Sequence, residues 1–328
     1  MKKIISWILF FLILYISVDA SNKILVEKTK NTYYMLSEEL KQVEDIDVQV
    51  YGSCHAYTSF NTKSFSEQSG VSSYNISNAG EIMPATYLRM KERFEKDTPK
   101  VAVVETWGIN AYETYISYEA LMEKYLSVNV ENIPISKEKI EVIRDFEALD
   151  LLEENFAVLK YKDRLLEFSL SEVDFNYSFE RMWELFNSDG ENTKLIDIKN
   201  RFDHNGFLYN ESEALADYKE QQAKVEENEL LAIEPIIMKY VNKIIDLCKA
   251  YGVELIFYRA PYISTENELR KINYLEKYLR ERGVDFYDME KLIDFDYMLD
   301  FKDYQHLSAV GAEKTTQYLS NIILERKK

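Results

Sequence analysis

The stretch Lys100-Val101-Ala102-Val103-Val104-Glu105-Thr106 holds four apolar residues in succession between polar ends. Such a nearly continuous apolar run is typical of a strand that is buried on both faces of a parallel sheet. Residues 253–258 form a second run of this kind, and shorter β-type runs occur at residues 47–51, 73–76 and 284–287. We expect these five segments to be strands of one sheet.

Helical segments separate the strand-like runs. One follows Pro84, one spans residues 232–251 before Gly252, one spans residues 266–282 before Gly283, and the last spans residues 307–324. Glycine is a common residue just after a helix. Strand and helix thus alternate on both sides of the middle of the chain, which predicts an α/β fold with a doubly wound, flavodoxin-like parallel sheet flanked by helices.

The middle of the chain, residues 111–230, departs from this alternation. It is rich in Tyr, Phe, Leu and Glu, shows helical periodicity around residues 140–159, and has little strand character. We interpret it as a large, mostly helical insertion after the third strand, within an α/β domain of residues 46–328. The insertion either covers the sheet without a further role or forms a lid or cap beside the site, since long excursions from α/β loops are commonly functional.

The N-terminus carries Lys2 and Lys3 before an apolar run from Ile4 to Val18, which predicts a signal peptide or a signal anchor at residues 1–20. The run is shorter than the roughly 20 residues of a spanning helix, which favours a signal peptide. Against cleavage, Asp19 is unusual in a cleavage site, and short helices can anchor by local thinning of the bilayer. We take the uncleaved anchor as the prediction.

That anchor would leave the rest of the chain outside the cytoplasm, because positive residues stay inside. Residues 21–45 would then form a stalk, and the protein would be secreted if the segment were cleaved. The alternative is a buried N-terminal helix of the core, which would need apolar surroundings on every face.

The composition bounds the size of the core and the partners. A chain of 328 residues can bury a large core in one big domain or two modest ones. The formal net charge of −17 argues against a nucleic acid or an anionic membrane surface as the main partner, because like charges repel. No Gly-rich phosphate-binding motif is present, so no nucleotide cofactor is predicted. CxxC and HExxH spacings are also missing, so no metal site is predicted either.

The chain contains 2 cysteines. Cys248 continues a stripe with Ile237, Val241 and Ile244 at helical spacing, which predicts a small buried side chain. Cys54 therefore looks like a free thiol. In an exported chain the two could instead form one disulfide.

Several polar and glycine residues directly follow predicted strands. Ligands of parallel sheets gather at the carboxyl ends of the strands, where the connecting loops converge. We therefore expect these residues to lie on one rim and assign three of them, His55, Asn78 and Arg259, to substrate binding. The residues of this rim are Cys54 and His55 after the first strand, Asn78 and Gly80 after the second, Gly108 and Asn110 after the third, and Arg259 after the fourth.

Cys54 stands before a predicted helix, a position that stabilises a thiolate, and a nearby imidazole would lower its pKa further. Far along the chain, Asp303 precedes His306 by three residues, a spacing that lets a carboxylate orient an imidazole for acid-base work. Gly80 can offer a close backbone N–H, and Asn110 an amide, to an oxyanion. Taken singly, each residue also has a structural interpretation as a buried thiol, a helix cap or a turn residue.

Four segments stand in an order that resembles the SGNH/GDSL hydrolase superfamily: Gly52-Ser53-Cys54-His55, Asn78-Ala79-Gly80, Gly108-Ile109-Asn110 and Asp303-Tyr304-Gln305-His306. The resemblance frames the α/β portion of the chain and leaves the insertion unaccounted for. It implies that Cys54 is the nucleophile, that His306 is the base oriented by Asp303, and that Cys54, Gly80 and Asn110 form the oxyanion hole.

Two departures from the family pattern stand in the first segment. The family nucleophile is normally serine, and here Cys54 occupies the matching position. Because Ser53 precedes it, a shifted register with Ser53 as the nucleophile is an alternative, although Cys54 is the residue that matches the motif. Cysteine makes a good acyl-thioester intermediate, and it can equally mark a site that has lost hydrolysis.

With its predicted anchor and its insertion, the chain is similar to the membrane-attached, extracytoplasmic DltD-like branch, which implies acyl modification of cell-surface polymers beside a membrane-bound O-acyltransferase. The first hypothesis is thus an esterase or acyltransferase that works through a Cys54 thioester on an acylated cell-surface glycan or with an acyl carrier. The alternative is a non-catalytic SGNH-like module that binds a glycan or a partner during envelope assembly. A third possibility is a scaffold whose acidic insertion engages another protein.

Overall fold

The computed structural model describes residues 2–25, 40, 43–110, 126–131, 133–146, 150–160, 202–203, 205–215 and 217–326. Five parallel strands form its sheet, in the spatial order β2-β1-β3-β4-β5. This order is that of a flavodoxin-like sheet, so the predicted α/β class and parallel sheet are confirmed. The strands are β1 (Val48–Tyr51), β2 (Ser73–Asn75), β3 (Val101–Glu105), β4 (Glu254–Arg259) and β5 (Asp285–Asp288).

The central position of β3 in the sheet explains why its residues 101–104 are all apolar. It pairs with β1 on one side and with β4 on the other. Ala102 and Val104 pack into one hydrophobic cluster and Val101 and Val103 into another. Because successive side chains of a strand point to opposite faces, a strand covered on both faces has to be apolar throughout.

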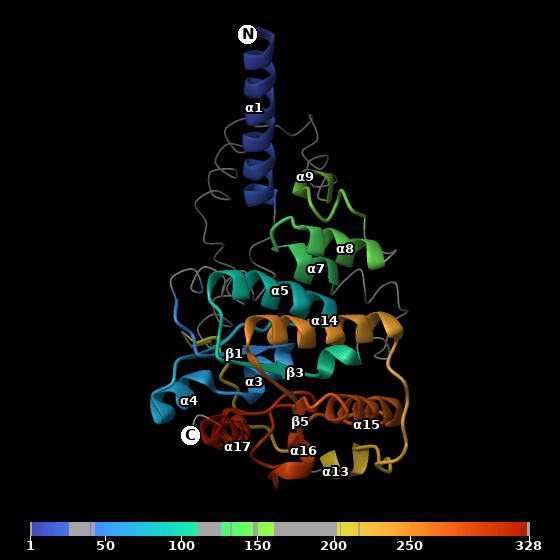
Figure 1. The fold of residues 1–328 in the computed structure, drawn as a ribbon. Coiled ribbons are helices and arrows are strands. Elements are labelled where there is room, and N and C mark those ends of the chain that lie inside the picture. Colours follow the sequence, from blue (N-terminus) through green and yellow to red (C-terminus); the bar gives the residue numbers. More distant parts are fainter. Residues whose placement is uncertain are drawn as a thin grey trace, which may run out of the picture.

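Helices cover both faces of the sheet. The first cluster is formed with α5 (Met83–Lys96), α14 (Pro235–Tyr251) and α15 (Glu266–Arg280). The second is formed with α3 (Cys54–Ser59), α4 (Thr62–Ser69) and α17 (Ala309–Glu325). Figure 1 shows α5 and α14 side by side over one face, with α17 on the opposite side. The shorter helical segments are η1 (Trp107–Ile109), α13 (Tyr218–Gln221) and α16 (Met289–Leu292).

The observed helix ends differ from the predicted ones by a few residues, for local reasons. Helix α14 begins at Pro235 because proline favours the first turn, where its missing N–H is not needed. Helix α17 begins after Ser308, whose Oγ accepts a hydrogen bond from the N–H of Gly311 at 3.2 Å. The segment that ends in His306 is therefore a loop before the helix.

The described part of the insertion packs on the sheet domain. Helices α7 (Ser127–Glu131) and α8 (Lys137–Asp145) contact α5 and place Val130, Val142 and Ile143 in its hydrophobic cluster. The periodicity of residues 140–159 does not form one helix. The backbone is extended at Phe146, and α9 (Ala157–Lys160) is separate. Residues 111–125 and 161–201 of the predicted lid lie outside the described residues.

The C-terminal part of the insertion covers the edge of the sheet. The carbonyl of Asn205 accepts from the N–H of Asn75 at 2.8 Å, and its side-chain amide donates to the carbonyl of Ser73 at 2.8 Å. The N–H of Leu208 then donates to the carbonyl of Tyr57 at 2.9 Å. An exposed strand edge tends to pair with other chains, and this segment occupies the edge of β2.

The N-terminal helix α1 (Lys2–Leu25) points away from the sheet (Figure 1). Within the described ranges, no helix combines the length and the apolar character that crossing a membrane requires. The predicted anchor at residues 1–20, and with it the anchored extracytoplasmic location, is therefore wrong. The apolar run from Ile4 to Val18 covers only about 22 Å at 1.5 Å per residue, against a hydrocarbon core of roughly 30 Å. Most of the predicted stalk, residues 26–39, lies outside the described residues.

Candidate active site

Cys54 stands at the end of β1, where a sharp turn leads into α3. Gly52 makes this turn with a φ of +139°, and a Cβ atom there would lie 2.8 Å from the Cβ of Glu105. Only glycine meets both demands. Ser53 caps the helix, since its Oγ accepts from the N–H of His55 at 3.2 Å. Cys54 is then the first residue of α3 and is partly exposed.

Asp303 and His306 form the second half of the site. His306 Nδ1 lies 3.0 Å from Asp303 Oδ1 and 3.1 Å from Oδ2. Asp303 Oδ1 also accepts from the N–H groups of Gln305 at 2.8 Å and His306 at 2.9 Å. A bridge between Phe301 and Leu307 closes this loop at its base. The loop thus presents an imidazole whose Nδ1 is held by a carboxylate.

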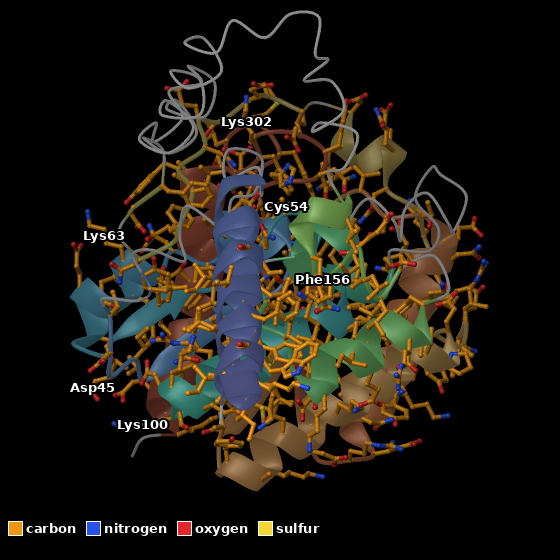
Figure 2. The ribbon with its side chains drawn as sticks, turned by 90° about the horizontal axis from the view of Figure 1, so that it is seen from above. Asp45, Cys54, Lys63, Lys100, Phe156 and Lys302 are labelled. Carbon is orange, nitrogen blue, oxygen red and sulfur yellow. The ribbon has the colours of Figure 1, made fainter. Side chains whose placement is uncertain are left out.

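The structure brings His306 close enough to Cys54 for each side chain to shift the pKa of the other. Cys54 Sγ also lies 3.9 Å from His55 Nδ1. Figure 2 shows Cys54 and Lys302, which precedes Asp303, on the side of the molecule away from Asp45 and Lys100, which precede β1 and β3. The predicted nucleophile, base and carboxylate therefore share the carboxyl-end rim of the sheet.

The three groups shift one another's pKa in a consistent direction. Burial would raise the pKa of the Cys54 thiol, but the interactions with His55 and His306 hold it well below its usual value. Burial would lower the pKa of His306, but the hydrogen bonds with Asp303 and Cys54 raise it to about 10. Burial opposes ionisation of Asp303, yet its bond to His306 lowers its pKa. The shifts of Cys54 and His306 both favour a thiolate beside an imidazolium.

His55 is buried in a group of aromatic rings beside Cys54. Its ring is stacked with Trp107 at 5.5 Å between centroids and with His306 at 5.3 Å, and it is tilted against Tyr262 at 4.8 Å. Its Nδ1 lies 3.0 Å from Ser53 Oγ. His55 was predicted to bind substrate, and the structure places it in contact with the proposed nucleophile.

Ser53 and Glu105 lie beneath this group. Ser53 Oγ donates to Glu105 Oε2 at 2.9 Å, and both side chains are fully buried. Glu105 Oε1 accepts from the N–H of Trp107 at 2.8 Å. Ser53 thus supports the turn, which disfavours the register in which it is the nucleophile. The sequence reasoning missed Glu105, although a charged residue that ends an apolar buried strand was a signal for it.

The predicted oxyanion residues stand in loops that join at this rim. The N–H of Asn78 donates to the carbonyl of Gly52 at 3.1 Å, which ties the loop after β2 to the loop after β1. Gly80 has a φ of +63° in that loop. A Cβ at Gly108 would lie 2.9 Å from the carbonyl oxygen of Glu81, so the loops after β2 and β3 also touch.

Asn110 connects to the site through Tyr262. Its Nδ2 donates to the Tyr262 hydroxyl at 2.7 Å, and the Tyr262 ring contacts His55. Asn110 is fully buried, and its Oδ1 has no hydrogen-bond partner among the described residues. The free atom is an acceptor, so only the second N–H of Nδ2 can donate to an oxyanion.

Asn78 and Arg259, both predicted to bind substrate, have structural partners. Asn78 Nδ2 donates to Asn129 Oδ1 at 2.7 Å and so joins the rim to α7. Arg259 is 1% exposed and forms ion pairs with Asp288 at 3.0 Å and Glu290 at 3.1 Å. Its guanidinium lies 5.1 Å from the centre of the Tyr262 ring. Arg259 thus packs behind Tyr262.

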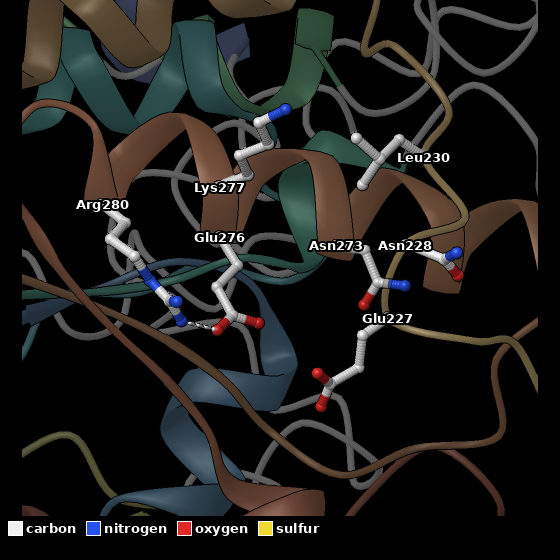
Figure 3. A pocket seen from close by; sticks show the side chains of 7 residues that line it. All are labelled: Glu227, Asn228, Leu230, Asn273, Glu276, Lys277 and Arg280. Carbon is white, nitrogen blue, oxygen red and sulfur yellow. Dashed lines mark hydrogen bonds and ion pairs between the residues drawn. The ribbon is translucent and has the colours of Figure 1, made fainter.

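A separate pocket of about 370 Å³ lies along α15 (Figure 3). Apart from Leu230 it is lined by polar residues, among them Asn273, Glu227 and an ion pair of Arg280 with Glu276 at 2.6 Å. It shares no residue with the Cys54 group. In the part of the chain that the structure describes, no three His, Cys, Asp or Glu side chains converge as metal ligands would.

Comparisons with known proteins add little on activity. A family model that carries no functional description matches residues 191–328. No curated protein sequence matches the chain significantly. Among solved structures, a candidate acylhydrolase from Bacteroides fragilis is similar with a TM-score of 0.43 and 10% identity, over 89% of this chain and 95% of that chain. This likeness is too low to support an argument about activity, which therefore depends on the geometry of the site.

Proposed function

We propose that this protein is an esterase or acyltransferase that carries an acyl group on Cys54 as a thioester. The observation that supports this most is the group of Cys54, His306 and Asp303. The thiol interacts with an imidazole whose Nδ1 is held by a carboxylate at 3.0 and 3.1 Å. This is the arrangement that an activated nucleophile requires.

In the first step, the Cys54 thiolate attacks the carbonyl carbon of an ester. The C–S bond forms, and the C–O bond to the alcohol breaks. Protonated His306 gives its proton to the departing oxygen, so that the alcohol leaves neutral and a neutral imidazole remains. Asp303 keeps the proton on Nδ1 and thereby leaves the other ring nitrogen for this transfer.

In the second step, a water or an acceptor alcohol attacks the thioester. Neutral His306 takes the proton of the attacking hydroxyl, the C–S bond breaks, and the Cys54 thiolate is regenerated beside an imidazolium. Water as the acceptor gives hydrolysis, and an alcohol gives acyl transfer. Both reactions use the same residues, so the acceptor that reaches the site decides between them.

Each step passes through a tetrahedral oxyanion. We assign its stabilisation to the backbone N–H groups of Cys54 and Gly80 and to the amide of Asn110, which the SGNH/GDSL resemblance implies. The positive φ of Gly80 and the hydrogen bond that joins Asn78 to Gly52 support this assignment, because they fix the loop that carries the Gly80 N–H.

The substrate class is proposed from the resemblance alone. It favours an acyl group on a glycan hydroxyl, or an acyl carrier that delivers such a group. A panel of acetylated saccharides compared with simple acetyl esters would therefore measure how much of the specificity lies in the sugar.

The test is the covalent intermediate. The full chain is mixed under reducing conditions with 4-nitrophenyl acetate, and its intact mass is followed over time. We expect a transient acetyl adduct that is absent in Cys54→Ala and slower to form in His306→Asn. Cys248→Ala is the matched control, because Cys248 is buried in the core and should leave the adduct unchanged. If the wild-type chain stays unmodified with this ester and with longer acyl esters, the proposal fails in favour of a non-catalytic binding module.

A further inference from the structure

A second set of polar groups reaches the Cys54 sulfur, separate from Asp303 and His306. Glu105 Oε2 lies 2.9 Å from Ser53 Oγ, Ser53 Oγ lies 3.0 Å from His55 Nδ1, and His55 Nδ1 lies 3.9 Å from Cys54 Sγ. Glu105 and Ser53 are fully buried, and His55 is 3% exposed. The acyl-transfer steps above do not use this chain of contacts.

The protons in this series of hydrogen bonds can be placed by elimination. The backbone N–H of His55 donates to Ser53 Oγ, and an ionised Glu105 can only accept from it. The one proton of the Ser53 hydroxyl therefore goes to Glu105. The remaining short contact of Ser53 Oγ, with His55 Nδ1, then requires the proton to be on Nδ1.

The contact of Nδ1 with Ser53 decides the tautomer. His55 Nε2 is buried and has no hydrogen-bond partner among the described residues, so it is unpaired whether or not it carries the proton. A proton on Nε2 would leave the lone pair of Nδ1 against the lone pairs of Ser53 Oγ at 3.0 Å.

We propose that the Nδ1–H of His55, whose nearer acceptor is Ser53 Oγ at 3.0 Å, is shared with the Cys54 sulfur at 3.9 Å as a second donor to it, and that Glu105 fixes the proton on His55 Nδ1 through Ser53. The inference rests on Cys54 being the nucleophile of the proposed function. Cys54 thereby accepts from two imidazoles, one held by Asp303 and the other by Glu105 through a serine. His55 contacts the reacting sulfur, whereas Glu105 and Ser53 are positioning residues.

The charged and titratable groups near the sulfur come from three segments. His55 lies on α3, Glu105 at the end of β3, and His306 with Asp303 in the loop before α17. Burial raises the pKa of Glu105, while His55 and the hydrogen bonds from Trp107 and Ser53 counteract this rise. A protonated Glu105 would donate to Ser53 and reverse the chain of hydrogen bonds.

Glu105→Gln imitates that reversal without changing the shape of the side chain. The N–H of Trp107 needs an acceptor, so the amide oxygen has to face Trp107 and the NH₂ group has to face Ser53. Ser53 then turns its proton toward His55 Nδ1, and the donor to Cys54 is lost. A purely structural role of Glu105 would not produce this loss, because the packing is preserved.

The experiment measures the pH dependence of Cys54 alkylation by iodoacetamide in the full chain, with intact mass as the readout. His55→Phe keeps a ring against Trp107 and Tyr262 but removes the donor, whereas His55→Asn offers an N–H near the position of Nδ1. We expect His55→Phe and Glu105→Gln each to slow alkylation at mildly acidic pH about tenfold, with the acid limb moved upward by about one pH unit. His55→Asn should recover part of the loss.

Asp97→Asn is the matched control, since this carboxylate is also mostly buried, with 10% of its side chain exposed, but lies at the amino ends of the strands. It should leave the profile unchanged. Wild-type profiles for both His55→Phe and Glu105→Gln overturn the proposal. If the alkylation profile moves in His55→Phe but not in Glu105→Gln, the role of Glu105 is overturned.

This experiment is independent of acyl chemistry. If the alkylation profiles shift as expected but no acyl adduct forms in the wild-type chain, the inference stands and the proposed function fails. If the adduct forms but the profiles do not shift, the inference alone fails.

Discussion

The imidazole rings of His55 and His306 are stacked, with 5.3 Å between their centroids and 24° between their planes. The two residues lie at opposite ends of the folded domain in sequence, and both interact with the Cys54 sulfur. The fold thus places two imidazoles and one thiol at the same rim of the sheet. Cys54 therefore differs from an isolated cysteine, because it has two imidazole partners.

The identity of the nucleophile can be decided between the two neighbouring residues Ser53 and Cys54. We expect Ser53→Ala to keep the acyl adduct, at a rate reduced about tenfold, because a positioning hydrogen bond is lost rather than the attacking atom. Cys54→Ala should remove the adduct completely. Peptide mapping of the acylated chain measures both, and an acyl group found on Ser53 in the wild-type chain would contradict the assignment.

The turn before Cys54 should be intolerant of any side chain. Gly52→Ala places a Cβ 2.8 Å from the Cβ of Glu105 at a φ of +139°. We expect a loss of about 2–3 kcal/mol in the free energy of unfolding, together with a slower Cys54 alkylation. The measurement is urea denaturation followed by circular dichroism.

Gly70→Ala is the control for this substitution. Gly70 also has a positive φ, +68°, but no atom lies within 4 Å of a Cβ built there. It should cost only about 1 kcal/mol and leave alkylation unchanged. Equal losses in the two variants would mean that the backbone conformation, and not the contact with Glu105, limits position 52.

Arg259 should behave as a structural residue. Its guanidinium is buried between Asp288 and Glu290, so Arg259→Ala removes the nearest cation from both carboxylates and is expected to cost about 3–5 kcal/mol of stability. Arg270→Ala, which removes a more exposed group from its pairs with Glu229 and Glu266, should cost far less stability. Stable folding of Arg259→Ala with a raised KM would instead restore the predicted role in substrate binding.

Local patterns made the sheet predictable from the sequence. A strand covered on both faces is apolar at most positions, so β3 and β4 were visible as nearly continuous apolar runs. Helices α14 and α17 begin a few residues later than predicted, because Pro235 and Ser308 set their first turns. The hydrophobic periodicity does not locate a helix end to within one turn. The N-terminal helix was mistaken for an anchor because local thinning of the bilayer was expected to compensate for an apolar run that is shorter than a spanning helix.

The site was predictable only in part. The position of Cys54 after β1 and the spacing of Asp303 and His306 are visible in the sequence, because parallel strands bring their carboxyl ends together. Glu105, Trp107 and Tyr262 were not found, since their roles depend on contacts between loops that are far apart in the chain. Asn78 and Arg259 lie at the carboxyl ends of the strands, as predicted. Nothing in the sequence indicated that the Asn78 amide would bond to Asn129 or that the Arg259 guanidinium would pair with Asp288.

The pH dependence of turnover should differ between the two chemical steps. Acylation needs the Cys54 thiolate and protonated His306. It should therefore proceed at full rate from mildly acidic pH, because the thiol pKa is lowered, and decline as pH rises through about 10, where His306 loses its proton. In His306→Asn the acid limb should move upward toward the ordinary thiol pKa of about 8.5.

Deacylation reverses the demand on His306. The thioester carries no negative charge, so His306 loses one of the two partners that raise its pKa, and the neutral imidazole that deacylation needs becomes accessible at lower pH. We expect the burst of product release from 4-nitrophenyl acetate to be flat across neutral pH, while the steady-state rate rises with pH over the same range. Stopped-flow absorbance resolves both phases in one experiment. Parallel pH profiles for the two phases would show that one group with one pKa governs both steps, and the ion pair between Cys54 and His306 would then have no part in the reaction.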